Sequence, residues 1–531
     1  MEDDKFFLQK KMDRGIKFFN SNQLDKAIEC FRYLENNNKT KKAALLYLGV
    51  IEIKKQNNNN AKKHLNKIIE IDFNNELANL NLGLLSFQEK KFSETKTYLN
   101  KVLTVNTGNT VAKYHLGLIN LLNKEFEAAE EIFGQILKIE PKNISVLNNL
   151  GIIYLKQQKF DEAINVFKNC LNLNKSHKFS ILNLGNAYFH VKDFENAIVK
   201  YNKILSLDKN HTMAKIGLSK CYFAKHDYKK GFKFFEARKN LQVKNPKLIQ
   251  KINTKFETKE WFGQNLDNKT ILILSEQGIG DNIQFARYIF LLKEKFNTDI
   301  FFCIEKRISH LFKDCPCKII SDPTELEKID FYQHLLTLPY IFFEKENNFQ
   351  KSIPFIKINR KNEIHWIKRL DKLKKPLIVL QWKGNKNYID DQLRSLPLKF
   401  FDKLITNKNF SFLSLQKDKS PSEIQENNFQ NFITDLSGEI DMGDKSFEDT
   451  ISILNNVDLL IGVDTSMVHL AATLGIETLL ILNANPDWRW HIQSKNKCFY
   501  EKLKIIQSKN LNDWSNITGL IDQELNHRFK L

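Results

Sequence analysis

A period of 34 residues runs through the first 240 residues of the chain and limits its possible folds more than any other feature. Three kinds of residue recur with it: a small residue, a second small residue 12 positions later, and a large apolar residue four positions after that. The first series is Gly15, Gly49, Gly83, Gly117, Gly151, Gly185 and Ser219; the second is Ala27, Ala61, Thr95, Ala129, Ala163, Ala197 and Gly231; the third is Phe31, Leu65, Leu99, Phe133, Phe167, Tyr201 and Phe235. A repeat of this length suits a pair of helices that buries its apolar face only by stacking on the next pair.

These positions match the tetratricopeptide pattern, in which Leu-Gly-x-x-Tyr is followed by Ala-x-x-x-Phe. The pattern is complete at Leu150–Tyr154 with Ala163 and Phe167. The small residues let the two helices of a hairpin approach closely, and the bulky residue fills the groove against the next hairpin. The sequence therefore predicts an all-α superhelix of seven tetratricopeptide repeats over residues 1–240.

A stack of such hairpins leaves a concave surface that commonly receives peptides or extended chains. We therefore expect a protein or peptide partner on the concave surface of the repeats. The alternative is that the array serves as a spacer or an oligomerisation arm, which needs no bound peptide.

Composition narrows the choice of partners and compartment. Lys and Arg number 81 against 62 Asp and Glu, and the resulting net charge of +19 favours acidic partners such as nucleotides, nucleic acid or anionic membranes. No motif that combines basic and aromatic residues accompanies this charge, so we expect no nucleic-acid partner. No apolar run reaches the ~20 residues of a membrane helix, the first residues lack a signal-peptide pattern, and the seven cysteines are scattered. These features predict a cytoplasmic protein without a transmembrane segment.

The 34-residue period stops near residue 240, and a different pattern follows. We expect residues 241–268 to be a linker, after which strand-like and helix-like runs alternate. The strand-like runs are Ile271–Leu274, Ile300–Cys303, Pro376–Gln381, Phe410–Leu415, Val457–Val463 and Thr478–Leu482. This alternation predicts parallel, doubly wound sheets. Because about 260 residues remain, we expect two such subdomains, over residues 269–365 and 366–531.

Polar residues at strand ends are the candidates for a site, since ligands of doubly wound sheets bind at the carboxyl ends of the strands. The first group, Glu276 to Asp281, follows directly on a predicted strand and contains two glycines that permit a tight turn. Asp281 would open a helix expected to begin near Asn282, so it suits the role of helix cap as well as that of a catalyst. The third glycine of a dinucleotide-binding fingerprint is absent.

A second group, Trp382 to Asn385, follows the strand predicted to end at Gln381. Gly384 and Asn385 offer backbone and amide donors, and Arg394 downstream offers a charged fork for a diphosphate. The alternative is a surface loop with an unpaired arginine.

The third group is Val463–Ala472, where a strand runs straight into a helix. Backbone amides and the helix dipole at such a junction attract phosphate. Thr465, Ser466 and His469 add side-chain donors in the first turn. The alternative is a capped helix with a histidine in the core.

Taken together, residues 257 to about 515 resemble glycosyltransferases of the heptosyltransferase superfamily, which have the GT-B fold, in the subgroup with N-terminal tetratricopeptide repeats. The motifs that carry the resemblance are Glu276–Tyr288, Thr337–Pro339, Ser414–Lys417, Val463–Ala471 and Pro486–Trp490. The chain is also similar, more distantly, to O-linked N-acetylglucosamine transferases. The expected fold class is therefore an all-α tetratricopeptide superhelix followed by an α/β GT-B glycosyltransferase with two Rossmann-like subdomains.

The resemblance implies a role for each matching residue. Asp281 matches the general base proposed to deprotonate the acceptor hydroxyl. The residues implied on the donor side are Gly384, Asn385, Arg394, Lys417, Asp464, Thr465, Ser466 and His469. Those implied on the acceptor side are Glu276, Gln277, Gln284 and Arg287. Ser466 and Lys383 depart from the residues usual in the family and change the expected fit of the donor.

These roles imply an inverting transfer of a sugar from a nucleotide-diphosphate sugar to a hydroxyl on a protein, glycan or lipid. The amino end of a helix, with Arg394 and His469, would stabilise the leaving diphosphate. No Asp-x-Asp motif stands at a strand end, so we expect neither a metal ion nor another cofactor. The rival interpretation is a non-catalytic interaction scaffold whose glycosyltransferase-like domain is inactive. This chain retains Asp281, Arg394, Asp464 and His469, which argues against the rival interpretation.

Overall fold

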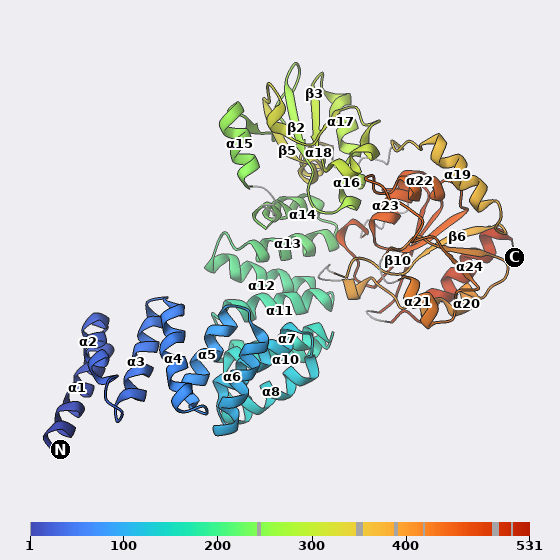
Figure 1. The fold of residues 1–531 in the computed structure, drawn as a ribbon. Helices are drawn as coiled ribbons and strands as arrows, with labels where there is room; N and C mark the ends of the chain where they lie inside the picture. Colours follow the sequence, from blue (N-terminus) through green and yellow to red (C-terminus); the bar gives the residue numbers. More distant parts are fainter. Residues whose placement is uncertain are drawn as a thin grey trace. The chain divides into compact units, whose positions relative to one another are not determined.

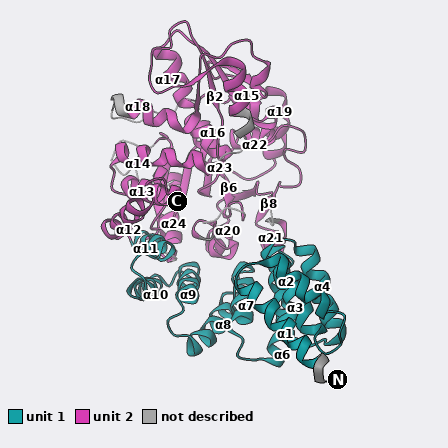
Figure 2. Cartoon of the chain, turned by 90° about the vertical axis from the view of Figure 1, so that its left-hand side faces the viewer, with its two compact units in different colours: residues 1–191 teal, residues 192–531 magenta. Residues whose placement is uncertain are grey.

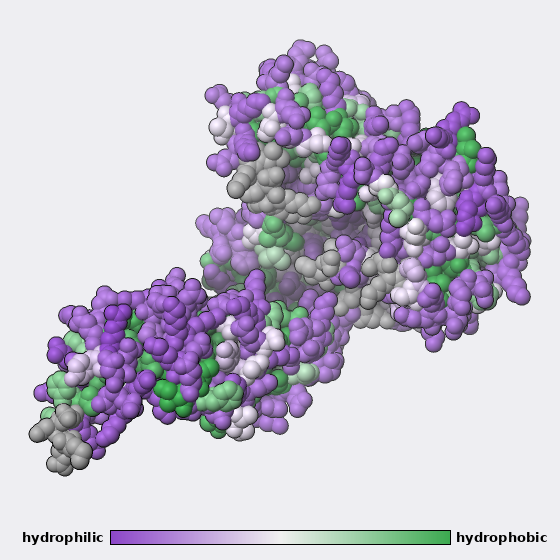
Figure 3. All heavy atoms as spheres, viewed as in Figure 1, coloured by the Kyte–Doolittle hydropathy of each residue, from purple (hydrophilic) through white to green (hydrophobic). Residues whose placement is uncertain are grey.

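The computed structural model describes residues 2–241, 246–346, 354–386, 391–417, 420–490, 499–510 and 513–530. Its contacts divide the chain into two compact units, Met1–Val191 and Lys192–Leu531 (Figure 2). The first unit is helical, and the second combines helices with two parallel sheets. Within the described ranges, no helix is both long and apolar enough to cross a lipid bilayer. The face of the molecule drawn in Figure 3 is mostly hydrophilic, with apolar side chains in scattered groups.

Helices joined by short turns make up the first unit (Figure 1). They are α1 (Glu2–Asn20), α2 (Leu24–Leu34), α3 (Lys41–Lys54), α4 (Asn58–Ile71), α5 (Glu76–Gln88), α6 (Phe92–Val105), α7 (Thr110–Leu122), α8 (Phe126–Ile139), α9 (Ile144–Lys156), α10 (Phe160–Leu173) and α11 (Lys178–His190). The predicted all-α tetratricopeptide region is thereby confirmed.

The small residues of the period lie where the two helices of a hairpin touch. Ala163 and Phe167 on α10 are fully buried, and a Cβ at Gly151 on α9 would lie 2.5 Å from the Phe167 ring. Gly117 stands in the same relation to Phe133, at 2.6 Å. Glycine is therefore required at this position of the first helix, because the aromatic ring of the second helix packs directly against it.

Each hairpin turns through one residue in the left-handed region of backbone space. In the first unit these residues are Asn22, Gln56, Lys90, Lys124 and Gln158, with φ between 57° and 65°. Their amides and those of the next residue bond back to the first helix, as Lys90 N does to Phe87 O at 2.9 Å and Lys91 N does to Ser86 O at 2.9 Å. This is the Schellman way of ending a helix, which usually employs glycine. Because no glycine marks these turns, the sequence pattern did not reveal them.

Gly151→Ala should destabilise the repeats, because the added methyl group overlaps the Phe167 ring. We expect the free energy of unfolding to fall by roughly 1–3 kcal/mol, measured by urea titration with far-ultraviolet circular dichroism. The matched control is Gly134→Ala within α8, where nothing lies within 4 Å of the new Cβ. That control should gain up to about 1 kcal/mol from the better helix former. Equal effects of the two substitutions would contradict the packing described.

The second unit begins with helices that continue the repeat period: α12 (Phe194–Leu207), α13 (Thr212–Ala224), α14 (Tyr228–Phe235) and η1 (Glu236–Asn240). The segment expected to be a linker then contains helix α15 (Pro246–Phe256) and strand β1 (Lys259–Glu260), and its Trp261 is fully buried. The compact units therefore divide before the last repeat helices. The domain boundaries at residues 240 and 268 stay predictions.

The first sheet has five parallel strands in the order β1-β5-β2-β3-β4. Its elements after β1 are β2 (Thr270–Leu274), α16 (Ile279–Phe285), α17 (Arg287–Lys295), β3 (Asp299–Cys303), β4 (Lys318–Ile320), β5 (Phe331–His334) and α18 (Leu338–Glu346), with short turns η2 (Lys306–Phe312), η3 (Pro323–Glu325) and η4 (Leu335–Thr337). The strand order reverses at β2, so the turn that leads from β2 into α16 lies at the point where ligands of such sheets bind.

The second sheet has six parallel strands in the order β11-β10-β9-β6-β7-β8, which is the Rossmann order with its switch between β6 and β9. The strands are β6 (Leu377–Gln381), β7 (Ser411–Ser414), β8 (Ile433–Asp435), β9 (Leu459–Val463), β10 (Thr478–Leu482) and β11 (Leu503–Gln507). The helices and turns are α19 (Arg360–Leu370), η5 (Asp391–Leu393), η6 (Leu398–Phe401), α20 (Asp402–Ile405), α21 (Ser420–Glu426), α22 (Glu448–Leu454), α23 (Ser466–Thr473), η7 (Trp488–Trp490) and α24 (Ile517–Phe529). Two Rossmann-like subdomains with parallel sheets thus follow the repeats, as predicted.

Candidate functional site

The carboxyl ends of β6 and β9 are neighbours at the switch point of the second sheet. Thr465, which follows β9, donates a hydrogen bond from its hydroxyl to Gln381 Oε1 at the end of β6, at 2.9 Å. The Thr465 side chain therefore makes no capping bond to α23. An amino end of a helix without a side-chain cap, at a switch point, is suited to bind an anion.

Helix α16 packs against α23 (Figure 1), and this contact brings the first and third predicted groups together. A Cβ at Gly280 would lie 2.7 Å from His469 Cδ2 and 3.3 Å from Ser466 Cα. A side chain at position 280 would push the two helices apart. Glycine is therefore required here by close approach and not by its backbone angle.

Asp281 lies in the first turn of α16 and not in front of the helix. The helix begins at Ile279, so the expected start near Asn282 is wrong, and Gly278 occupies the N-cap position. The Asp281 carboxylate accepts a hydrogen bond from Gly278 N at 2.9 Å and pairs with Arg489 Nη2. Burial raises the pKa of Asp281 above its usual value, and the Arg489 guanidinium limits the rise. The carboxylate therefore supports the helix start and also belongs to a charged cluster.

Arg489 is the charged residue that the sequence analysis failed to single out. It lies in the turn η7, and its Nη1 donates to Asp487 Oδ1 at 2.5 Å while its Nη2 donates to Asp281. Burial tends to raise the pKa of Asp487, but Arg489 holds that pKa below its usual value. The motif Pro486–Trp490 marked this turn in the sequence, but nothing in it signals a partner some 200 residues away.

His469 is buried and electrically neutral. Its Nδ1 lies 2.8 Å from Tyr500 Oη, its Nε2 lies 3.9 Å from Asp464 Oδ1, and its ring stacks on Trp490 with centroids 5.2 Å apart. Burial, with a further contribution from Arg489, lowers the pKa of His469 to about 3. The imidazole can therefore exchange hydrogen bonds with a ligand, but it adds no positive charge near pH 7.

Asp464 is the third carboxylate of this cluster. Burial, and then the charge of Asp487, raise the pKa of Asp464 to about 6, while Arg489 and Arg394 oppose the rise. Three carboxylates thus lie within reach of one central guanidinium. Such a concentration of buried charge is costly for stability, and groups with perturbed pKa values cluster at functional sites.

Arg394 lies beside the same helix end. Its Nη1 donates to the backbone oxygen of Asp464 at 2.7 Å, and its Nε donates to Asp391 Oδ1 at 3.0 Å. A Cβ at Gly384 would lie 2.6 Å from the Arg394 guanidinium, so glycine leaves the room that the arginine occupies. The structure therefore brings the second predicted group next to the third.

The remaining donor-side candidates lie at the edge of this region. Asn385 is exposed directly after Gly384. Lys417 is also exposed, and its Nζ donates to the backbone oxygen of Asp441 at 2.9 Å. The loops after β6 and β7 are tied together by Lys383 N, which donates to Gln416 Oε1 at 3.0 Å.

Glu276, expected on the acceptor side, is held in a buried ion pair. Its carboxylate accepts from Arg238 Nη2 at 2.7 Å and Nε at 3.1 Å, and from Leu336 N at 2.9 Å. Arg238 belongs to η1, at the end of the repeat helices. The contacts of Glu276 thus join the last helices of the repeat series to the first sheet.

The other acceptor-side candidates have mixed surroundings. Arg287 is buried and donates from Nη1 to Phe499 O at 2.7 Å, which ties α17 to the segment before β11. Gln277 has a φ of 58° in the turn before α16, and its Oε1 accepts from Arg489 at 3.4 Å. Gln284 is fully buried, and neither polar atom of its side-chain amide has a hydrogen-bond partner among the described residues.

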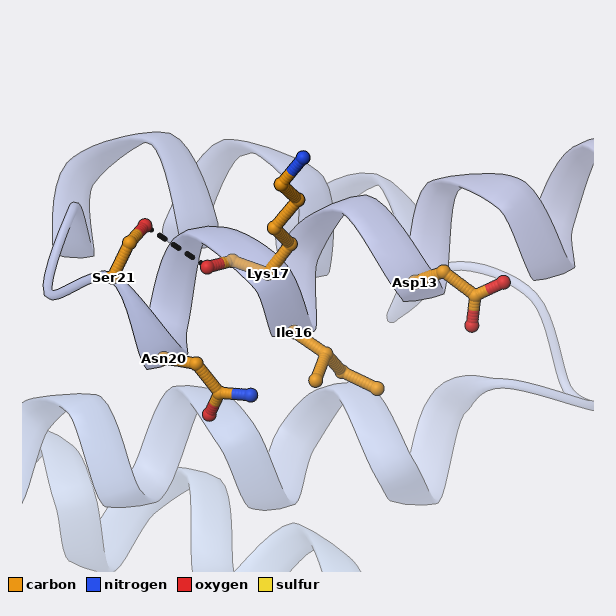
Figure 4. Close-up of a pocket in the computed structure, with 5 residues that line it drawn as sticks. All are labelled: Asp13, Ile16, Lys17, Asn20 and Ser21. Atoms are coloured by element: carbon orange, nitrogen blue, oxygen red, sulfur yellow. Dashed lines mark hydrogen bonds between the residues drawn. The ribbon is translucent and has the colours of Figure 1, made fainter.

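Hollows in the described part of the chain also lie outside this cluster. One, of about 540 Å³, runs along α1 in the first unit and is lined by Asp13, Ile16, Lys17, Asn20 and Ser21. Its side chains project from α1 and from the turn directly after it, and Ser21 Oγ bonds to the backbone of Lys17 at 2.9 Å, so they do not converge on a ligand (Figure 4). Another, of about 270 Å³, lies at the ends of β10 and β11 and is lined by Lys192, Phe194, Ala224, His226, Ala484, Asn485, Gln507 and Ser508.

Comparison with known proteins identifies the helical region. Residues 11–179 match the family described as tetratricopeptide repeat protein 21 C-terminal ARM domain, and residues 180–211 match the tetratricopeptide repeat family. Residues 11–211 are tetratricopeptide repeats. An α/β region with two parallel sheets follows them, and neither matching family is a glycosyltransferase family.

Individual relatives are distant. Protein FlbA of Caulobacter vibrioides is 22% identical over 290 residues, which are 49% of this chain and 47% of that protein. The chain therefore spans about half the length of the curated relative that it matches. A tetratricopeptide repeat protein from Parabacteroides merdae is 16% identical and covers 46% of this chain and 97% of its own, with a TM-score of 0.37. PilF of Pseudomonas aeruginosa is 19% identical and covers 38% and 91%, with a TM-score of 0.34.

Glu276→Gln should destabilise the second unit strongly, because it leaves Arg238 buried without a full counter-charge. The two side chains are only 3% and 6% exposed, but Glu236 still pairs with Arg238 at 2.7 Å, so we expect a loss of roughly 1–3 kcal/mol. Urea unfolding followed by tryptophan fluorescence measures this, since the six tryptophans all lie in the second unit.

The matched control for this prediction is Glu305→Gln. Glu305 pairs with Arg307 at 2.9 Å, but both side chains are more than half exposed. An exposed pair contributes about 0–1 kcal/mol, so this control should unfold almost like the wild type. A Glu276→Gln variant as stable as the control would contradict a structural role for the buried pair.

Proposed function

We propose that the α/β region is an inverting glycosyltransferase with the GT-B arrangement. It moves a sugar from a nucleotide-diphosphate sugar to a hydroxyl acceptor without a metal ion. The observation that carries the proposal is that Asp281, after β2 of the first sheet, shares one charged cluster with Asp464, after β9 of the second. In this proposal the first sheet supplies the group that takes a proton, and the second sheet supplies the site for the diphosphate.

The donor site is supported by topology and charge. Nucleotides bind doubly wound sheets at the switch point, here between β6 and β9, with phosphate at a helix amino end. Arg394 lies beside the amino end of α23, with its Nη1 2.7 Å from Asp464 O. Negative charge grows on the diphosphate as the bond to the sugar stretches, and donors fixed in advance stabilise that charge most in the transition state.

The acceptor hydroxyl needs a base, and Asp281 has the chemistry for it. Burial raises the pKa of Asp281, which makes the ionised carboxylate a better proton acceptor than an ordinary aspartate. Arg489 opposes that rise and so favours the ionised form of the carboxylate. A base on one side of the sugar and the leaving diphosphate on the other give in-line displacement, which inverts the anomeric centre.

The repeats would recruit the acceptor or a scaffold partner. Tetratricopeptide arrays present a concave surface to peptides and extended chains, and a protein or peptide is therefore the partner that we propose for them. A glycan or lipid acceptor would instead reach the α/β region directly.

A non-catalytic scaffold is the second candidate, and one observation favours it. The Asp281 carboxylate is already paired with Arg489, and that of Glu276 with Arg238, so neither acid is uncommitted in this structure. Thermal-shift measurements with a panel of nucleotide sugars separate the two candidates. Stabilisation by at least one nucleotide sugar supports the enzyme, and stabilisation by none supports the scaffold.

Asp281→Asn should retain donor binding and lose sugar transfer by roughly two to four orders of magnitude, the usual share of general-base catalysis. The asparagine oxygen can still accept the hydrogen bond from Gly278 N, so the helix start is preserved. The measurements are the turnover number and calorimetric titration with the donor.

The matched control is Asp322→Asn, because Asp322 also accepts a hydrogen bond from a backbone amide, that of Thr324 at 2.9 Å. The Asp322 side chain is exposed after β4, an edge strand of the first sheet, and its loss should not affect transfer. Near wild-type transfer by Asp281→Asn would reduce that residue to a structural role.

A further inference from the structure

Arg489 is the positive charge that the carboxylates of the cluster share. It donates to Asp281 and to Asp487, and it lowers the pKa of Asp464 against the effect of burial. Its own side chain is only 11% exposed. Among the described residues, Arg394 acts more weakly on Asp464, and Lys220 of α13 acts more weakly on Asp487.

The position of Arg489 is fixed by the residue before it. The indole of Trp488 stacks on Phe223 with ring centroids 4.4 Å apart and an angle of 17° between the ring planes. It also makes edge contacts with Phe232 and Phe235, at 5.6 and 5.5 Å. These three phenylalanines belong to α13 and α14, the last helical hairpin of the repeat series.

The Arg489 guanidinium also lies over aromatic rings. It stands 4.9 Å from the Trp488 ring and 5.9 Å from the ring of Phe285 on α16. Stacking of this kind holds the planar fork of an arginine in one orientation. The last hairpin therefore determines where the turn η7 lies, and the turn determines where the guanidinium points.

We infer that Arg489 is a positioning residue that orients the Asp281 carboxylate and balances its charge, and that the last helical hairpin sets its position through Trp488. The inference rests on the proposed function in so far as Asp281 is the base of a transfer reaction. It adds a physical link between the repeat helices and the proposed base, because a change in the last hairpin would reach Asp281 through the adjacent residues Trp488 and Arg489.

The sign of the effect follows from the environment of Asp281. Burial and the neighbouring Asp487 raise the pKa of Asp281, whereas Arg489 and the amide of Gly278 lower it. Without the guanidinium, the carboxyl would bind its proton more tightly and would be the active, ionised base only at higher pH. A positive charge in direct contact with an aspartate generally lowers the pKa of that aspartate by about one to three units.

The experiment compares Arg489→Gln and Arg489→Lys in the full chain, with kcat/KM for sugar transfer measured from pH 5 to pH 9. For Arg489→Gln we expect the acidic limb of the profile to move up by about one to three pH units. At a pH below the acidic limbs of both the wild type and the variant, kcat/KM of the variant should be lower by about tenfold for each pH unit of the shift. Arg489→Lys retains the charge and should recover most of the shift while losing orientation, which lowers kcat at every pH.

The matched control is Arg369→Gln, which removes one arginine from an exposed pair with Glu439. It should leave the profile unchanged. A second variant, Phe223→Leu, loosens the stack on Trp488 without touching the cluster, and it should lower kcat more than it changes KM.

An acidic limb at the wild-type pH in Arg489→Gln would overturn the inference, and so would equal losses in the Gln and Lys variants. If the wild type transfers sugar from no donor, the proposed function fails. Urea unfolding then tests separately whether Arg489 and Asp281 stabilise each other. Arg489→Gln combined with Asp281→Asn should unfold at a higher urea concentration than Arg489→Gln alone, because one fewer uncompensated carboxylate is left buried. Strictly additive effects of the two substitutions would contradict the pairing.

Discussion

Helices α16 and α23 pack so closely that position 280 has no room for a side chain, and the charged groups of the α/β region are arranged around this contact. A Cβ at Gly280 would lie 2.7 Å from His469. The contact brings the end of β2 to the end of β9, so that Asp281 and Asp464 come under the influence of the same guanidinium, that of Arg489. Carboxylates buried to this degree are tolerated only beside a compensating cation. The electrostatics of the candidate site therefore depend on one close helix contact.

The last helices of the repeat series are structurally part of the α/β unit. Trp488 stacks on Phe223 of α13, and Arg238 of η1 forms a buried pair with Glu276 after β2. The first link is apolar and the second is ionic. Trp488 lies in the last of the sequence motifs of the α/β region, and Glu276 lies in the first. This explains why the compact units divide at residue 191, although the 34-residue period continues to about residue 240. A repeat array anchored in this way can influence the site as well as deliver a partner to it.

Much of this organisation could be predicted from the sequence, and the exceptions have physical reasons. Steric patterns are local and periodic, so the hairpins and the long apolar strands such as Thr478–Leu482 were found at or near their true positions. The missed strands are short, like the three-residue β8, or polar, like β5 with its Gln333 and His334. Strand ends gave the candidate residues, but a sequence does not show which charges meet. The pairs of Arg489 with Asp281 and of Arg238 with Glu276 join residues 208 and 38 positions apart, and the neutral state of His469 follows from burial that only the fold creates.

The central claim is that the amino end of α23, at the switch between β6 and β9, receives a nucleotide diphosphate. A crystal structure of the full chain with a bound nucleoside diphosphate, chosen by thermal shift, tests this most directly. The account predicts phosphate oxygens about 3 Å from backbone amides in the first turn of α23 and from the Arg394 guanidinium. A diphosphate bound away from α23, for example in the hollow at the ends of β10 and β11, with neither of these contacts, would contradict it.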